Sequence, residues 1–219
     1  MNEDLKNNVL KSNTSLLGIV CKDGIIMAAD RQTTAGNIVV NKSKTKIDQI
    51  NDYLLASWTG MVSDAQMTRK IVAAELRLKE LRSKQRSTVK EAASLLASIS
   101  YKNIRQFSAV QGIVGSLVAG LNEDGSFELY TIEPAGSVSK VEDYDANFSS
   151  GMPYILGLLE KEYKEDITVK EGIQLAINAI KASSQGDTGS GYGIDVFTIT
   201  KEGIKHEVKQ KVHFELREN

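Results

Sequence analysis

The sequence predicts an α+β protein with four layers, in which two antiparallel sheets pack face to face and a helix pair covers each outer face. Patterns typical of strands and of amphipathic helices alternate in blocks: strands, two helices, strands, two helices, strands. Segregated blocks of this kind favour antiparallel sheets with helices in separate layers. No linker rich in proline or glycine divides the 219 residues, so we expect one compact domain.

The first block of strands opens with a hairpin. Residues 16–21 and 25–29 are apolar, and they flank Asp23-Gly24, a pair that favours a two-residue turn. Shorter strand patterns follow at residues 38–40, 45–50 and 53–59. Gly60 ends this block.

The next block has the period of helices. Apolar side chains recur at steps of three and four residues: Met67, Ile71, Ala74, Leu78 and Leu81. This spacing predicts an amphipathic helix from about Val62, with that apolar stripe facing the core. Thr88 and Glu91 match a capping box, which predicts the start of a second helix.

The second half of the chain repeats this order. Strand patterns lie at residues 112–121, 127–132 and 138–144, and later at 194–200 and 204–208. Between them, Pro153 suits the first turn of a helix. Thr168 and Glu171 match a second capping box and predict another helix.

Composition excludes several classes of partner. With 27 basic and 28 acidic residues, the chain has no excess charge that would favour nucleic acid or an anionic membrane. Residues 1–13 lack the apolar run of a secretory signal, and no apolar stretch is long enough to cross a membrane. The single cysteine, Cys21, cannot form an internal disulfide. We therefore expect a cytoplasmic protein.

The sequence does not favour a metal site or a catalytic site that depends on histidine. The chain has 2 histidines, His206 and His213, without a cysteine or carboxylate at the spacing of metal ligands, so we expect neither a metal nor another cofactor. Thr14 instead opens the first strand pattern, directly after a polar leader. If that leader were removed, Thr14 would carry a hydroxyl nucleophile and a free amine able to act as its base. The alternative is that Thr14 is only the first residue of a strand.

Other polar residues also have two interpretations. Asp30 ends a strand pattern, and Lys46 lies either among solvent-facing lysines or on the inner face of a strand. The glycine-rich segment 186–193 follows a helix and precedes a strand, the reverse of a dinucleotide-binding loop. It is either an ordinary turn or backbone that approaches a reacting group closely.

Six short motifs occur in a specific order: TSLLG at 14–18, AADR at 28–31, KI at 46–47, TG at 59–60 with DAQ at 64–66, SSGMP at 149–153, and DTGSG at 187–191. By these motifs the chain resembles a proteasome β-type subunit of the archaeal kind, within the N-terminal-nucleophile hydrolases. The resemblance covers residues 14–208 and implies the αββα sandwich of that superfamily. It also implies a propeptide at residues 1–13 and a single peptidase domain at residues 14–219.

The resemblance assigns roles around Thr14. The bond between Asn13 and Thr14 would be cut autocatalytically, which exposes Thr14 as the nucleophile of a threonine endopeptidase. Its new α-amine, with a pKa of about 8, would act as the general base. Lys46 would favour deprotonation of the hydroxyl, and Asp30 would neutralise and orient Lys46.

Further residues follow from the same resemblance. The backbone N–H of Gly60 would stabilise the oxyanion. Ser150, Asp187 and Ser190 would hold the amine and a catalytic water. Thr34 would bind the substrate backbone as an added strand. The pocket for the residue before the cut bond would be formed by Thr33, Lys44, Asp48, Trp58, Val62 and Gln66.

Three residues depart from the family pattern. Asn13 replaces the usual glycine before the nucleophile, so self-cleavage is expected to be slower or to depend on assembly. Gln32 replaces a residue that is often basic, and Trp58 is bulkier than the expected aliphatic side chain.

The resemblance also implies partners. These would be α-type subunits and other β subunits in stacked seven-membered rings, an ATPase regulator that acts through the α ring, and unfolded polypeptide as substrate. One alternative is a structural β subunit that is not processed. The other is the simpler bacterial peptidase of this superfamily, which docks to a hexameric ATPase.

Overall fold

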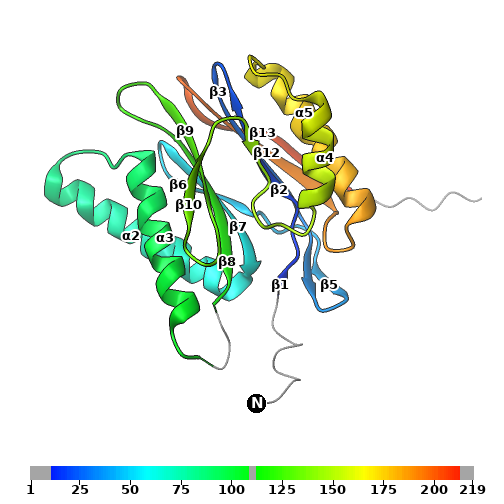
Figure 1. The fold of residues 1–219 in the computed structure, drawn as a ribbon, viewed down its shortest axis with the longest axis horizontal. Helices are drawn as coiled ribbons and strands as arrows, with labels where there is room; N and C mark the ends of the chain where they lie inside the picture. The colour runs from blue at the N-terminus through cyan, green and yellow to red at the C-terminus, as the bar shows by residue number, and fades with distance from the viewer. Residues whose placement is uncertain (1–10, 109–111, 213–219) are drawn as a thin grey trace, which may run out of the picture.

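The computed structural model describes residues 11–108 and 112–212. It confirms the four-layer arrangement (Figure 1). Within the described residues, one sheet has six strands: β1 (Lys11–Ser12), β6 (Ile47–Asn51), β7 (Leu54–Met61), β8 (Val114–Leu121), β9 (Phe127–Ile132) and β10 (Val138–Val141). The other has five: β2 (Leu16–Cys21), β3 (Gly24–Asp30), β11 (Tyr144–Asp145), β12 (Gly193–Thr200) and β13 (Gly203–Lys211).

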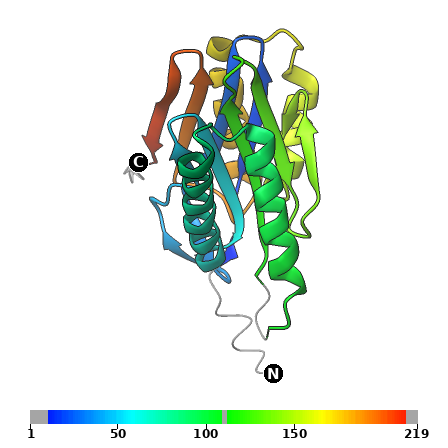
Figure 2. The ribbon, with the colours of Figure 1, turned by 90° about the vertical axis from the view of Figure 1, so that its left-hand side faces the viewer.

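All strand pairs in both sheets are antiparallel. The first sheet runs in the order β1-β7-β8-β9-β10, with β6 also paired to β7, and the second in the order β11-β2-β3-β12-β13. A separate hairpin joins β4 (Thr33–Ala35) to β5 (Ile38–Asn41). The helices are α2 (Val62–Ser83), α3 (Val89–Arg105), α4 (Met152–Glu162) and α5 (Val169–Gly186). Figure 2 shows α2 and α3 side by side in front of the first sheet.

Three apolar cores, counted among the described residues, hold the four layers together. Leu76, Leu96 and Val118 belong to the core between α2, α3 and the first sheet. The side chain of Leu16 lies in the central core between the two sheets. That of its neighbour Leu17 lies in the core between the second sheet and the helices α4 and α5. Successive side chains of a strand point to opposite faces, so β2 is buried on both sides. This explains why residues 16–21 are continuously apolar rather than alternating.

The predicted buried face of α2 is wrong. Met67 and Leu81 are 59% and 61% exposed, and Ile71, Ala74 and Leu78 are also exposed. The helix instead buries Thr68, Val72 and Leu76, which lie four residues apart. The predicted stripe and the buried stripe both have helical spacing, so spacing alone does not distinguish the two faces of α2. The sequence pattern therefore identified the helix but not the face that meets the sheet.

Strand details also differ from the sequence prediction. The segment predicted as one strand at 138–144 is divided, because β10 pairs with β9 in the first sheet and β11 pairs with β2 in the second. Strands β1 and β4 were not predicted. The two-residue turn of the first hairpin is Lys22–Asp23, because Cys21 pairs with Gly24. Gly24 is needed for close packing, since a Cβ there would lie 2.2 Å from the carbonyl oxygen of Ile199.

The predicted helix starts are confirmed. Thr88 with Glu91, and Thr168 with Glu171, form complete capping boxes at α3 and α5. Pro153 lies in the first turn of α4. In the part of the chain that the structure describes, no helix is long and apolar enough to cross a membrane.

Candidate functional site

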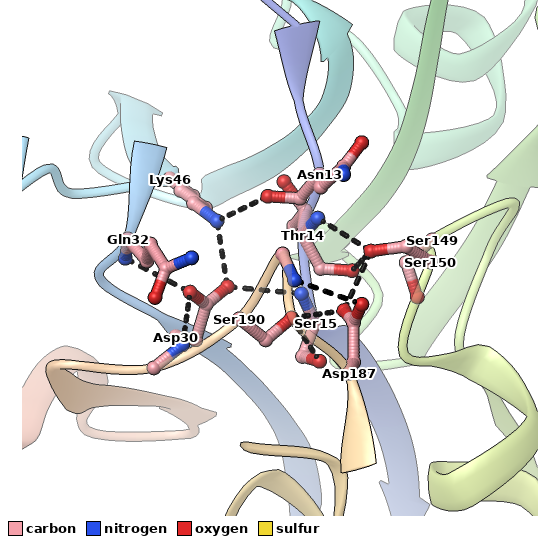
Figure 3. A network of polar contacts seen from close by, with 12 residues as sticks. Asn13, Thr14, Ser15, Asp30, Gln32, Lys46, Ser149, Ser150, Asp187 and Ser190 are labelled. Atoms are coloured by element: carbon pink, nitrogen blue, oxygen red, sulfur yellow. Dashed lines mark hydrogen bonds and ion pairs between the residues drawn. The ribbon is translucent and has the colours of Figure 1, made fainter. Parts of the chain in front are cut away.

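Thr14 lies where the chain passes from one sheet to the other. The preceding strand, β1, belongs to the first sheet, and the following strand, β2, belongs to the second. Thr14 itself is fully buried, with 0% exposure. Its amide nitrogen donates to Ser150 Oγ at 3.0 Å, and its carbonyl oxygen accepts from the Gly151 N–H at 3.2 Å. The turn before α4 therefore fixes the backbone of Thr14 on both sides (Figure 3).

A buried ion pair lies on one side of Thr14. Lys46 Nζ is 2.6 Å from Asp30 Oδ1, and the two side chains are 3% and 0% exposed. Asp30 also accepts from the backbone N–H groups of Ser15, Gln32 and Gly191, at 2.9, 2.8 and 3.0 Å. These four donors explain why a carboxylate at the end of β3 can be buried.

Burial shifts the proton affinities of both members of this pair. Desolvation raises the pKa of the Asp30 carboxyl, against the attraction of the nearby lysine. Desolvation also lowers the pKa of the Lys46 ammonium, against the attraction of Asp30. The neutral form of Lys46 is therefore more accessible than that of an exposed lysine.

Lys46 also contacts the peptide bond before Thr14. Its Nζ donates to the carbonyl oxygen of Asn13 at 3.1 Å (Figure 3). A cation at this position polarises the carbonyl and stabilises negative charge that develops on its oxygen. Lys46 thus links the Asp30 carboxylate to the carbonyl group of Asn13.

A chain of hydroxyl groups and one carboxylate lies on the other side of Thr14. Ser150 Oγ, which accepts from the Thr14 nitrogen, donates to Asp187 Oδ2 at 2.6 Å. Ser190 Oγ donates to the same oxygen at 2.5 Å and accepts from Ser15 Oγ at 2.7 Å. Ser15 Oγ also makes a short contact with Ser183 Oγ. Asp187 is partly exposed and Ser150 is exposed, so this cluster borders solvent.

Gly60 lies opposite Ser12, the residue that precedes the Asn13–Thr14 bond by one position. Its φ is +97°, and a Cβ there would lie 2.1 Å from the carbonyl oxygen of Ile113, so the position requires glycine. Strand β1 pairs with this end of β7, with Ser12 opposite Gly60. The residues before Thr14 therefore add a strand to β7, and β1 also packs beside β4.

A small pocket adjoins Lys46 and Gly60. Its volume is about 40 Å³, and it is lined by Lys44, Thr45, Lys46, Asp48, Trp58, Thr59, Gly60, Val62, Ala65 and Gln66. Trp58 is buried, and its Nε1 donates to Asp48 Oδ2 at 3.0 Å, while Arg69 pairs with Asp48 Oδ1 at 3.2 Å. Asp48 is thus engaged by two donors.

The structure brings the predicted residues together in part. Thr14, Asp30, Lys46, Ser150, Asp187 and Ser190 form one continuous polar network. Lys44, Asp48, Trp58, Val62 and Gln66 line one pocket. Thr33 and Thr34 lie outside that lining, on β4.

Sequence reasoning gave no structural role to three neighbours of the site. Ser15 joins the hydroxyl chain, and a signal for it existed, because two polar residues open an otherwise apolar strand pattern. Gln32 Nε2 donates to the carbonyl oxygen of Thr188 at 2.8 Å and fixes the glycine-rich segment. Arg31 pairs with Asp195, a contact between β3 and β12 that no local pattern predicts.

Among the described residues, no three His, Cys, Asp or Glu side chains lie close enough to hold a metal ion. His206 contacts Asp195 at 3.0 Å, and His213 lies outside the described residues.

Comparisons with known proteins identify the family of this chain. The profile of the proteasome subunit family matches residues 10–199. The proteasome subunit beta of Nanoarchaeum equitans is 41% identical over 88% of this chain and 95% of its own length. That of Methanobrevibacter smithii is 38% identical over 91% and 93%, and that of Methanopyrus kandleri is 35% identical over 92% and 94%. The chain therefore belongs to the proteasome subunit family, and within it resembles the β subunits of archaea.

Proposed function

We propose that this chain is a catalytic β subunit of a proteasome core particle, a threonine endopeptidase that hydrolyses unfolded polypeptides. In this proposal residues 1–13 are a propeptide, of which residues 1–10 lie outside the described part, and residues 14–219 are the peptidase domain. The observation that carries it is the position of Thr14, buried between the Lys46–Asp30 pair and the Ser150–Asp187–Ser190 cluster.

Self-cleavage needs a base other than the amine of Thr14, because in the uncleaved chain that nitrogen is an amide. Lys46 has a pKa lowered by burial, so its neutral form can take the hydroxyl proton of Thr14, directly or through a water. Thr14 Oγ then attacks the carbonyl carbon of Asn13. The resulting Lys46 ammonium, 3.1 Å from the carbonyl oxygen, stabilises the oxyanion.

Collapse of that intermediate breaks the C–N bond between Asn13 and Thr14. The leaving nitrogen takes up a proton and becomes the free α-amine, while Asn13 is left as an ester on Thr14 Oγ. Water hydrolyses the ester to a carboxylate on Asn13 and restores the hydroxyl of Thr14. The chain now begins with a residue that carries both the nucleophile and a base.

Peptide substrates would react by the same steps with a different base. The free amine of Thr14, held near Ser150 and Asp187, accepts the hydroxyl proton through a water. The Gly60 N–H supports the oxyanion of the acyl-enzyme reaction. Hydrolysis of the ester then releases the second product.

The leader supports an assignment of the substrate path. Strand β1 pairs with β7 at Gly60 and packs beside β4, which carries Thr33 and Thr34. A substrate in extended form would add a strand in the same place after the leader has left. The pocket of about 40 Å³ beside Gly60, which Trp58 helps to line, would receive the side chain before the cut bond.

An exposed apolar stripe supports assembly with other subunits. Met67, Ile71 and Phe107 are exposed and line one groove beside α2. Contiguous apolar surface of this kind commonly marks a protein interface. We assign the chain to stacked seven-membered rings with α-type and other β subunits in the cytoplasm, fed by an ATPase regulator through the α ring.

A structural β subunit is the second candidate. The observations in its favour are the bulky Trp58 in the lining of the small pocket and Asn13 in place of the glycine expected before the nucleophile. Such a subunit would complete a mixed ring and keep its leader.

Substitution of Thr14 separates the two candidates. We expect Thr14→Ala to abolish both leader release and peptidase activity in particles assembled with α-type subunits. Thr14→Ser is the matched control, because it retains a hydroxyl group and should retain measurable activity. Peptidase activity that survives in Thr14→Ala particles would contradict the nucleophile assignment.

A further inference from the structure

Gly189 lies directly against the residue before Thr14. A Cβ built on Gly189 would lie 2.1 Å from Asn13 Cβ and 2.9 Å from both Cγ and Nδ2 of that side chain. Real Cβ atoms essentially never approach other atoms this closely. The side chain of Asn13 therefore occupies the space that only a glycine at position 189 leaves open.

The segment that carries Gly189 is held from several sides. The N–H of Gly189 donates to Asp187 Oδ1 at 3.0 Å, and Gln32 Nε2 donates to the carbonyl oxygen of Thr188 at 2.8 Å. The Gly191 N–H donates to Asp30 Oδ2 at 3.0 Å. A methyl group on residue 189 would consequently displace Asn13 rather than the segment. The backbone of Gly189 does not have a positive φ, so alanine fits its conformation.

The contact with Gly189 completes a three-point attachment of the bond before Thr14. Lys46 holds the carbonyl oxygen of Asn13 at 3.1 Å, and Ser150 holds the nitrogen of Thr14 at 3.0 Å. Gly189 meets the third group, the Asn13 side chain. Neither Asn13 nor Gly189 lines the pocket beside Trp58, so this contact surface is separate from that pocket.

We propose that residues 187–191 form a seat for the Asn13 side chain, and that Gly189 positions the Asn13–Thr14 bond for self-cleavage. The seat is specific to processing: it recognises the residue before Thr14 in the same chain. The inference rests on the proposed self-cleavage. The seat explains how this chain can carry asparagine at position 13, because Gly189 leaves room for the asparagine side chain.

Four full-length chains test the seat, each assembled with α-type subunits and followed by intact mass over time. They are the wild type, Gly189→Ala, Asn13→Gly and the double variant. We expect Gly189→Ala to release the leader about tenfold more slowly, because an overpacked contact moves the bond out of position. Asn13→Gly and the double variant should release it at equal rates, because no side chain remains to clash. Gly157→Ala, with open space around its position, is the matched control and should behave as wild type.

The outcomes separate the inference from the proposed function. Equal or faster release by Gly189→Ala would overturn the seat. Slow release by the double variant as well would also overturn it, because the alanine would then act without Asn13. A wild-type chain that never loses its leader would contradict self-cleavage itself, and the seat with it.

Discussion

Thr14 lies between two polar clusters that differ in their exposure to water. On one side, Lys46 and Asp30 form an ion pair whose side chains are 3% and 0% exposed. On the other side, Asp187 and Ser150 border solvent and form a chain of hydroxyl and carboxylate contacts. Both clusters contact the backbone around Thr14, but from opposite ends of the bond between residues 13 and 14.

The difference in exposure indicates that the two clusters have different roles in the proposed reaction. Electrostatic interactions are strong where water is excluded, so the Lys46–Asp30 side suits proton transfer and stabilisation of the carbonyl oxygen. The Asp187 side can exchange water and hold the Thr14 nitrogen both as an amide and as a free amine. Disruption of the buried side should therefore affect folding and chemistry, and disruption of the exposed side mainly chemistry.

Removal of Lys46 should have the largest effect. Lys46→Met leaves Asp30 buried without its cation, which should lower the free energy of unfolding by about 3–5 kcal/mol and abolish leader release. Urea unfolding and intact mass measure the two effects. Lys70→Met on the exposed face of α2 is the matched control and should change neither.

A double variant separates stability from chemistry at this pair. Lys46→Met with Asp30→Asn removes both charges, so most of the lost stability should return while activity stays absent. Recovery of activity together with stability would show that the pair has only a structural role.

The pH dependence of stability is the next largest effect. Burial raises the pKa of Asp30, and the attraction of Lys46 opposes that rise, so Lys46→Met should raise it further. A folded state that binds a proton more tightly than the unfolded chain loses stability as the pH rises through that pKa. Above about pH 4, the free energy of unfolding of Lys46→Met should fall more steeply than that of wild type, by up to about 1.4 kcal/mol per pH unit. Parallel pH profiles would contradict the assignment of the shift to this pair.

The smallest effect is expected on the exposed side. Asp187→Asn keeps an acceptor for Ser150 and Ser190 but removes the charge, which should lower peptidase activity about tenfold. Its unfolding free energy should change by less than about 1 kcal/mol, because solvent compensates a partly exposed group. Asp166→Asn, at an exposed position, is the control. A stability loss as large as that of Lys46→Met would remove the distinction between the two clusters.

The fold could be predicted because its signals are local. Capping boxes at Thr88 and Thr168 and the apolar runs of β2 and β3 are properties of neighbouring residues. The buried face of α2 could not be predicted in this way, because Thr68, Val72 and Leu76 compete with a longer apolar stripe. Strand β1 was missed because two residues in a polar leader become a strand only through pairing with β7.

The site shows the same limit. Short motifs indicated Thr14, Lys46 and Asp187, whose proximity the structure shows. The contact of Gly189 with Asn13 joins residues far apart in sequence. No spacing rule relates them, so only the packed structure shows why glycine occupies position 189.

The central claim is that Thr14 becomes a reactive N-terminal residue. The most direct test is to treat assembled wild-type particles with an inhibitor that reacts covalently with N-terminal threonine, and to locate the adduct by peptide mass spectrometry. We predict a chain that begins at Thr14 and carries one adduct on that residue. A chain that still carries residues 1–13 and no adduct, in particles that contain both α and β rings, would contradict it.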